Sequence, residues 1–292
     1  MTARWWHEGE LAVQRRAGVE HPERLRTGVR NELPPHFVAF LAAQRFLVVS
    51  TVDARETLWC TMVPGWPGFA QARSTREVVV DVQAFEAGVL AQLRADPRIG
   101  MLAFDPSTRR RIRVNGIARV EAGAVAIGIA ETFGNCQQYI QKRPAVGPQG
   151  HAGEIVAAGD TLAASQRAWI AGADTCFLGS IHAVAGPDAS HRGGRPGFVE
   201  VLDDRTLRFD DYPGNDMFQT LGNLTATPVA ALLFVDFETG GTLQLAGEAD
   251  VLWDANRTLT GRAVRFRLRT AIEKRPATPW RWPVVEYSPV NP

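Results

Sequence analysis

The polar groups best suited to bind a ligand gather in the second half of the chain. The segment Asp188–Val201 reads DASHRGGRPGFVEV and places Ser190, His191 and Arg192 directly before Gly193. A histidine beside an arginine and two glycines offers hydrogen-bond donors on a backbone that a ligand can approach closely. This pattern suits a phosphate or the carbonyl-rich edge of a ring. A solvated hairpin that turns at the two glycines is the structural alternative.

A second group of polar residues follows in the stretch DYPGNDMFQTLGNL, which begins at Asp211. A Gly-Asn turn directly before a predicted helix leaves backbone N–H groups free at the start of that helix, and such a helix start binds anions. Asn215 is suited to cap this helix. The candidate binding residues of the stretch are Asn215, Phe218, Thr220 and Asn223. A helix cap with a purely structural role is the alternative.

Other chemistries find little support in the sequence. The six histidines show no paired spacing of the HExxH kind, so no metal site is predicted. There is no P-loop and no GxGxxG motif after a strand. A hydrolase built on Ser190 and His191 is disfavoured because adjacent residues of a strand point to opposite faces and no GxSxG elbow is present.

An internal repeat supplies the elements that must position these residues. Four segments recur in one order: FLVVSTV at 46–52 and FLGSIHAV at 177–184, PGF at 67–69 and 196–198, DPRIGMLAFD at 96–105 and TPVAALLFVD at 227–236, and RIRVNGIARV at 111–120 and TLQLAGEADV at 242–251. The offsets are 131 residues for three matches and 129 for the PGF match. This regularity indicates two tandem copies of one β unit; the alternative is that β-proteins reuse similar strands.

Each copy is expected to be a small, mostly antiparallel barrel. RIRVNGIARV alternates charged and apolar residues, as in a strand with one wet face, and its glycine suits a bulge. Helices are predicted before the first strand of each copy and again within each copy, over residues 35–44, 162–172, 84–94 and 215–224. We also predict an alanine-rich helical run within 121–140, and an edge strand from about residue 261 that leads into an extended tail.

Length and composition fit two soluble domains. The 292 residues are enough for two compact cores, and we predict a first unit over 1–143, a Pro/Gly-rich linker over 144–160 and a second unit over 161–292. A net charge of +1, without a basic block interleaved with aromatics, argues against nucleic acid as a partner.

The polar N-terminal stretch and the lack of a run of roughly 18 apolar residues predict a cytoplasmic protein without a membrane segment. Cys60, Cys136 and Cys176 are odd in number and far apart, which fits neither a disulfide framework nor a zinc pattern.

The HRGG and Gly-Asn segments resemble those of the pyridoxamine 5′-phosphate oxidase-related family of FMN-binding split barrels. There, an HRGG-x-PGF motif precedes a strand and a GN-x-x-x-x-x-LGNL segment, which match His191–Phe198 and Gly214–Leu224 here. The resemblance covers most of 174–253 and extends loosely to the first half through the repeat. It implies a mainly β fold with α insertions, in which two tandem split-barrel units form a pseudo-dimer and both segments line an FMN.

One position departs from the family pattern. Relatives often carry a basic residue just after the Gly-Asn pair, whereas this chain has Asp216. The resemblance therefore implies that the FMN phosphate relies on Arg192, Arg195 or an arginine from elsewhere in the chain.

A third segment, FGNCQQYIQKR at Phe133–Arg143, is similar to a GNC-x-x-YI-x-x-R stretch found beside the flavin in relatives. It adds Asn135, Tyr139 and Arg143 to the candidate FMN-binding residues, on a predicted helix over 134–143 that closes the site from the first unit. Cys136 invites interpretation as a nucleophile. No local base or CxxC partner supports that role, which favours a buried structural thiol.

The resemblance implies an FMN-dependent oxidoreductase, in which the cofactor does the redox chemistry and the protein supplies position and electrostatics. A small-molecule substrate, a reduced nicotinamide or a partner protein would exchange electrons with the flavin, and no residue is predicted to act as a nucleophile. A non-enzymatic flavin-binding, storage or sensor protein is one alternative. A binder of haem or another flat cofactor in the same cleft is the other.

The two copies differ where hydrogen-bond donors matter. The second has His191 and Arg192 where the first has Met62 and Val63, and the first copy lacks a Gly-Asn turn. Apolar groups cannot replace the donors that a buried phosphate needs. We therefore predict one working and one degenerate cleft, with one FMN per chain. A homodimer of whole chains is compatible with this arrangement but is not required by it.

Overall fold

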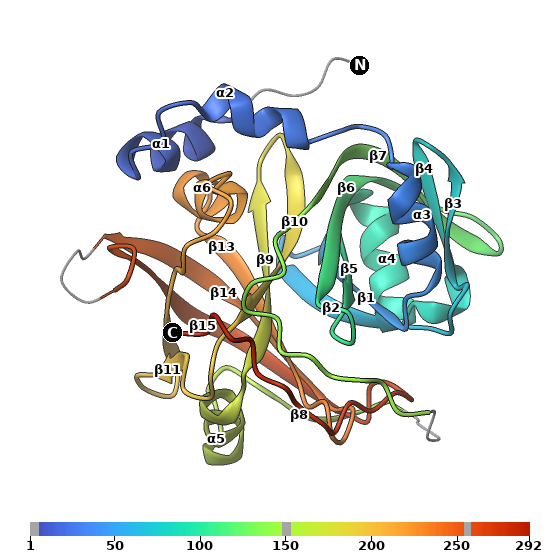
Figure 1. The fold of residues 1–292 in the computed structure, drawn as a ribbon. Helices are drawn as coiled ribbons and strands as arrows, with labels where there is room; N and C mark the ends of the chain where they lie inside the picture. The colour runs from blue at the N-terminus through green and yellow to red at the C-terminus, as the bar shows by residue number, and fades with distance from the viewer. Residues whose placement is uncertain (1–5, 148–152, 254–257) are drawn as a thin grey trace.

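The computed structural model describes residues 6–147, 153–253 and 258–292. The chain is mainly β, with two antiparallel sheets and short helices around them (Figure 1). This confirms the predicted fold class. In the part of the chain that the structure describes, no helix has the length and apolar character needed to cross a membrane.

The first sheet contains seven strands in the order β2-β1-β5-β6-β7-β4-β3. Their bounds are β1 (Phe46–Val52), β2 (Leu58–Pro64), β3 (Ala70–Ser74), β4 (Glu77–Asp81), β5 (Arg98–Asp105), β6 (Arg110–Val120) and β7 (Ala124–Gly134). The strand pairs are antiparallel throughout, so the sheet can be built from hairpins and short insertions.

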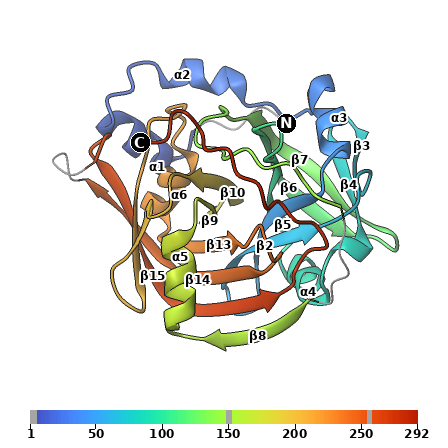
Figure 2. The ribbon, with the colours of Figure 1, turned by 60° about the horizontal axis from the view of Figure 1, so that its bottom comes forward.

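The second sheet has the order β10-β9-β13-β14-β15-β12-β11, which repeats the first order strand for strand, and β8 is added beside β15. The bounds are β8 (Glu154–Gly159), β9 (Thr175–His182), β10 (Gly186–Gly193), β11 (Val199–Val201), β12 (Thr206–Asp210), β13 (Val229–Val235), β14 (Thr242–Trp253) and β15 (Arg262–Arg275). Figure 2 shows β8 alongside β15 at the margin of this sheet.

A β-bulge recurs at the same place in both sheets. The register shifts between Asn115 and Gly116 in one sheet and between Ala246 and Gly247 in the other, and 246 minus 115 is 131. A Cβ atom on either glycine would lie 2.0 Å from a carbonyl oxygen of the paired strand. Only glycine therefore fits at this bulge. This explains why RIRVNGIARV and TLQLAGEADV both have a glycine there.

The register corrects one match of the repeat. Val48 pairs with Leu102 and Phe177 pairs with Leu233, which lies 131 residues after Leu102. Phe177 is therefore the counterpart of Val48, at an offset of 129, and not of Phe46 at 131. His191 pairs with Phe177 as Met62 pairs with Val48, so His191 occupies the position of Met62, as predicted.

The helices lie at matching places in the two units. Each unit has a helix before its first strand, α3 (Pro35–Ala42) or α5 (Ala164–Gly172), and one inserted later, α4 (Ala87–Ala95) or α6 (Gln219–Ala226). The segment before the first unit forms α1 (Glu8–Arg16) and α2 (Pro22–Leu25), and short 3-10 helices cover Arg26–Gly28 and Val82–Ala84. Helix α6 begins at Gln219 instead of Asn215 because Asp216 and Phe218 have left-handed backbone angles.

Three other expectations were wrong. The alanine-rich run within 121–140 forms β7, and the segment 134–143 contains turns and no helix. Strand β15 is no edge strand, since it pairs with β8, β12 and β14. The predicted linker 144–160 contains β8, while its residues 148–152 lie outside the described part of the chain.

Each unit has its own apolar core, and a third core joins the two. Phe46, Phe104 and Phe177 meet edge to face or tilted in this shared core, with ring centroids 5.2–6.3 Å apart. Strands β1 and β9 are therefore buried on both faces, which accounts for their nearly continuous apolar runs.

The contact between the sheets can be tested at Gly100 of β5. A Cβ atom there would lie 2.5 Å from the Cα atom of Asp188 in β10, so Gly100→Ala forces the two sheets apart. We expect a loss of about 2–4 kcal/mol in the free energy of unfolding. Chemical denaturation measures this loss.

Gly88→Ala is the matched control, because Gly88 lies in α4 with open space around its Cα atom. It should be neutral or stabilise by up to about 1 kcal/mol. Equal stability of the two variants would contradict the close packing of the units.

Candidate functional site

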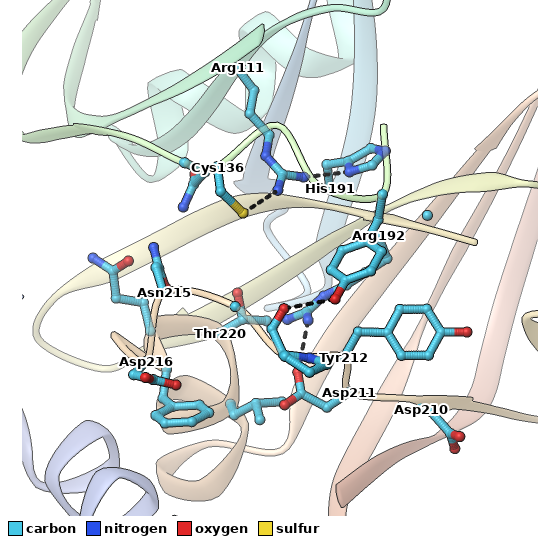
Figure 3. Close-up of a pocket in the computed structure, with 18 of the residues that line it drawn as sticks. Arg111, Cys136, His191, Arg192, Asp210, Asp211, Tyr212, Asn215, Asp216 and Thr220 are labelled. Carbon is cyan, nitrogen blue, oxygen red and sulfur yellow. Dashed lines mark hydrogen bonds and ion pairs between the residues drawn. The ribbon is translucent and has the colours of Figure 1, made fainter. Parts of the chain in front are cut away.

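A large cavity opens between the two units, with a volume of about 830 Å³ including the part open to solvent. Its walls come from β6 and the loop after β7 in the first unit, and from β10, the loop after β12 and the start of α6 in the second (Figure 3).

A buried carboxylate between the units supports the wall of the cavity. Asp188 of β10 is 3% exposed and accepts hydrogen bonds from two β6 side chains, Arg113 Nη1 at 2.6 Å and Asn115 Nδ2 at 3.1 Å. Arg113 and Arg111 are two residues apart on β6 and therefore point to the same face. The strand thus brings both guanidinium groups to the cavity.

A second carboxylate stands on the opposite wall. Asp211 is buried and accepts from Arg192 Nη1 and from Arg262 Nε, each at 3.0 Å. One negative charge is therefore shared by two arginines. Figure 3 shows Arg192 and Asp211 joined below the strand that carries His191.

Arg111 has no such partner. Within the described residues, its guanidinium contacts His191 Nδ1, Cys136 Sγ at 3.9 Å and the Gln138 carbonyl oxygen at 3.5 Å, and it pairs with no carboxylate (Figure 3). Burial lowers the Arg111 pKa to about 10, and the nearby charges of Arg113 and Arg192 act in the same direction. Arg111 still carries a full positive charge at neutral pH.

His191 is held neutral by the same surroundings. Its ring is 6% exposed and stacks on Phe104 with centroids 4.8 Å apart. Burial first, and then the charges of Arg111 and the other arginines, hold the His191 pKa well below its usual value of 6.5. Nδ1 accepts from Arg111, so Nε2 carries the proton, and this buried Nε2 has no protein partner within the described residues.

The charges of this wall do not balance. Arg111, Arg113, Arg192 and Arg262 give four positive charges, and Asp188 and Asp211 give two negative ones, which leaves a net charge of +2. Two further carboxylates line the cavity: Asp210 is paired with Arg208 at 3.0 Å, and Asp216 is exposed at the rim. Because uncompensated buried charge is costly, this wall favours an anionic ligand.

The start of α6 adds backbone donors to the same place. Its N-cap residue, Phe218, makes no side-chain capping bond, and the next three residues, 219–221, all line the cavity. The uncapped N–H groups and the positive end of the helix dipole therefore face the arginines across the cavity. Asn215 caps the backbone N–H of Met217 at 3.3 Å and does not cap the helix as predicted.

Two loops meet over the mouth of the cavity. Tyr139 Oη, from the first unit, donates to the carbonyl oxygen of Pro213 in the second at 3.0 Å, and its ring lies 5.1 Å from that of Tyr212. Burial raises the pKa of both phenols, so both keep their protons. A Cβ atom at Gly193 would lie 2.1 Å from the Tyr139 carbonyl oxygen, which explains this glycine of the HRGG segment.

Most of the predicted binding residues line this cavity. They are His191, Arg192, Gly193, Asn215, Phe218, Thr220, Asn135 and Tyr139. Three do not. Ser190 donates to the Leu178 carbonyl oxygen inside the second unit. Asn223 bonds to Ser180 and His7 behind α6, and Arg143 pairs with Asp174 and the Trp282 carbonyl oxygen.

The sequence arguments missed Arg111 and Arg113. Both belong to the first unit, and the repeat aligns them with Thr242 and Gln244 of the second unit. This difference between the copies is the signal that could have found them. The expectation for Cys136 was wrong as well, since its thiol is exposed at the cavity rim and is no buried structural group.

A potential metal site lies elsewhere, behind α6. His7, Glu8 and His182 could offer three ligand atoms within 4.8 Å of one another. However, Nδ1 of both histidines accepts backbone N–H groups, at 3.1 Å from Gly9 and Ala185. Each Nε2 therefore carries a proton, which it donates to Asn223 Oδ1 or to Glu8 Oε1. These atoms are engaged in hydrogen bonds and are not free to ligate.

Fold and site together describe a two-unit β protein with a positively charged cavity between its halves. Residues 162–277 match the family model described as Pyridoxamine 5'-phosphate oxidase. The second unit is therefore related to this family, as the HRGG and Gly-Asn segments predicted. No curated protein is significantly similar to the chain in sequence.

Several solved structures resemble one unit of the chain. HupZ from Group A Streptococcus is 13% identical with a TM-score of 0.30, over 37% of this chain and 90% of HupZ. A Clostridium acetobutylicum protein of the pyridoxinephosphate oxidase family is 13% identical with a TM-score of 0.29, over 37% and 83%. A FAD-binding protein from Mesorhizobium loti is 12% identical with a TM-score of 0.28, over 39% and 96%. Similarity at this level does not bear on function.

The neutral state of His191 predicts a pH-dependent stability. Because its folded pKa is lowered, the unfolded chain binds a proton below pH 6.5 that the folded chain does not. The stability is present above pH 6.5 and is lost as the pH falls towards the folded pKa, by up to about 1.4 kcal/mol per pH unit. Denaturation of ligand-free protein at pH 7.5 and 5.5 measures this loss.

In the variant His191→Gln this part of the pH dependence should disappear. His21→Gln is the control, because His21 is an exposed residue far from the cavity, and it should keep the wild-type slope. A wild-type slope in His191→Gln would contradict a buried neutral imidazole.

Proposed function

We propose that the chain binds FMN in the cavity between its units and acts as an FMN-dependent oxidoreductase. The family match of the second unit supports a flavin-binding, oxidoreductase-like function in general. The observation that carries the finer proposal is the guanidinium of Arg111, which lines the cavity half-buried beside two further arginines, without a carboxylate partner among the described residues.

The charge of the wall fits one phosphate group. A phosphate monoester carries about −1.5 to −2 at pH 7, which offsets the net charge of +2 around Asp188 and Asp211. The guanidinium groups of Arg111 and Arg192 both line the cavity and can donate to its oxygens. The free N–H groups at the start of α6 complete a donor set of the kind that phosphates prefer.

The rest of the cavity suits a flat ring. Phe198, Tyr139, Tyr212 and Phe218 give it aromatic surface, and Asn135 offers an amide that can bond to the polar edge of the ring. One phosphate site beside one aromatic chamber favours a mononucleotide such as FMN over FAD, whose second phosphate and adenylate would need further donors.

Bound FMN would supply the redox chemistry by accepting and releasing one or two electrons. The protein's own groups bind and orient it. Arg111 and Arg192 neutralise the phosphate, neutral His191 keeps its proton on Nε2, and the loops joined by Tyr139 and Pro213 limit the access of water. A small-molecule substrate, a reduced nicotinamide or a partner protein is proposed as the source or acceptor of electrons.

Two alternatives give different results in simple measurements. Purified protein with absorbance bands near 450 nm, whose released cofactor has the mass of FMN, fits the proposal; FAD, haem or no flavin under saturating supply contradicts it. No observation favours haem, because His191 is the one histidine among the cavity-lining residues and its Nδ1 is held by Arg111. Stopped-flow reduction by NADH or NADPH then separates an enzyme from a flavin store or sensor.

Arg111→Ala should weaken FMN binding to the apoprotein by about 1.5–3 kcal/mol, because it removes a charged donor that no carboxylate neutralises. Fluorescence titration measures the Kd. Arg110→Ala is the matched control, since Arg110 is the adjacent residue on β6 and its guanidinium lies over the Phe40 ring, away from the cavity. Equal Kd values for wild type and Arg111→Ala would show that the phosphate does not bind at Arg111.

A further inference from the structure

The loop that leads into α6 has an unfavourable backbone. Asp216 and Phe218 both have φ angles of +55°, and neither is glycine. The left-handed conformation costs such residues about 1–2 kcal/mol each. Met217 stands between them, and the residues after Phe218 present their N–H groups to the cavity. Other contacts must therefore hold the loop in this shape.

The contacts come from the N-terminal helix α1. Figure 1 shows α1 beside α6, and the two helices touch where Gly9 meets Gly222. A Cβ atom on Gly9 would lie 2.1 Å from the Gly222 carbonyl oxygen, so the approach requires glycine. At one end of α1, His7 Nε2 donates to Asn223 Oδ1 of α6 at 2.9 Å.

At the other end of α1, one side chain reaches the strained loop itself. Gln14 is fully buried, and its Nε2 donates to the carbonyl oxygen of Met217 at 3.0 Å. The Met217 side chain packs in a small apolar cluster with Trp6, Val29 and Phe133. The single residue between the two left-handed positions is thus held by its backbone and by its side chain. Neither Gln14 nor Trp6 lines the cavity.

We propose that α1 is a brace for the anion end of the cavity, and that Gln14 is its positioning residue. By holding the Met217 carbonyl, Gln14 keeps Asp216 and Phe218 left-handed and aims the first N–H groups of α6 at the arginines. The identity of the ligand rests on the proposed function, whereas the brace itself does not. Gly222 and Asn223, which belong to the family-like LGNL segment, serve here to dock α1.

Gln14→Met tests the proposal, because methionine keeps the length and helix preference of glutamine but donates nothing. Gln44→Met is the matched control. Gln44 is also buried and also donates Nε2 to a backbone carbonyl, that of Phe40 at 2.7 Å, and both Oε1 atoms are buried without a partner. Each variant loses one equivalent hydrogen bond, but only Gln14 bonds to the loop before α6.

Two readouts are compared, amide hydrogen exchange over residues 214–221 in ligand-free protein and the Kd for FMN. Gln14→Met should speed this exchange and raise the Kd about three- to tenfold, as expected for one lost hydrogen bond. Gln44→Met should change neither, even if both variants lose the same global stability. Unchanged exchange and Kd in Gln14→Met, or equal changes in both variants, would overturn the brace.

Failure of the proposed function gives a different pattern. If wild-type protein binds no FMN, the exchange measurement still decides whether Gln14 holds the loop. If wild type binds FMN and the exchange over 214–221 does not respond to Gln14→Met, the brace fails while the proposed function stands.

Discussion

The hydrogen bonds between Asp188 of the second unit and Arg113 and Asn115 of the first fix how the two units meet. Once the buried carboxylate is satisfied by these partners, Arg111 is left on the same face of β6 without a carboxylate partner in the described part of the chain. The negative charge of Asp211 does not neutralise Arg111, because Asp211 already pairs with Arg192 and Arg262. The interface thus stores an excess of positive charge in a site that neither unit could build alone, and breaking a buried pair of this kind is strongly unfavourable.

The same constraint explains why the two halves are not equivalent. At the offsets set by the register, the counterparts of Asp188 and His191 are Trp59 and Met62, which carry no charge. The place related to the cavity by the repeat is instead covered by the C-terminal tail, where Trp280 donates to the Gly65 carbonyl oxygen and Trp282 packs in the core shared by the units. Apolar packing there and charge on the other side support one ligand site per chain.

Local sequence predicted the strands well where repeat and alternation agreed, as in residues 111–120. The prediction failed over 124–134, where the alanines suggested a helix. Pairing of β7 with β4 and β6 outweighs that weak helix preference. The alternation of Val125, Ile127 and Ile129 fits a strand. The motifs of the second unit marked half of the cavity, including His191 and Arg192. The sequence could not identify Arg111 and Arg113 as site residues, because their role depends on β6 of the first unit packing against β10 of the second. Asn223 was misplaced because nothing in its own segment reveals that α1 docks there.

We propose that charge at the interface of the units selects a phosphate-bearing flavin, and paired titrations of apoprotein with FMN and riboflavin test this claim. The two ligands share one ring system and differ by the phosphate. Wild type should bind one FMN per chain, at least about a hundredfold more tightly than riboflavin, and Arg111→Ala should reduce this preference by about tenfold or more without changing the Kd for riboflavin. Equal affinity for the two ligands, or a preference that Arg111→Ala leaves intact, would contradict the claim.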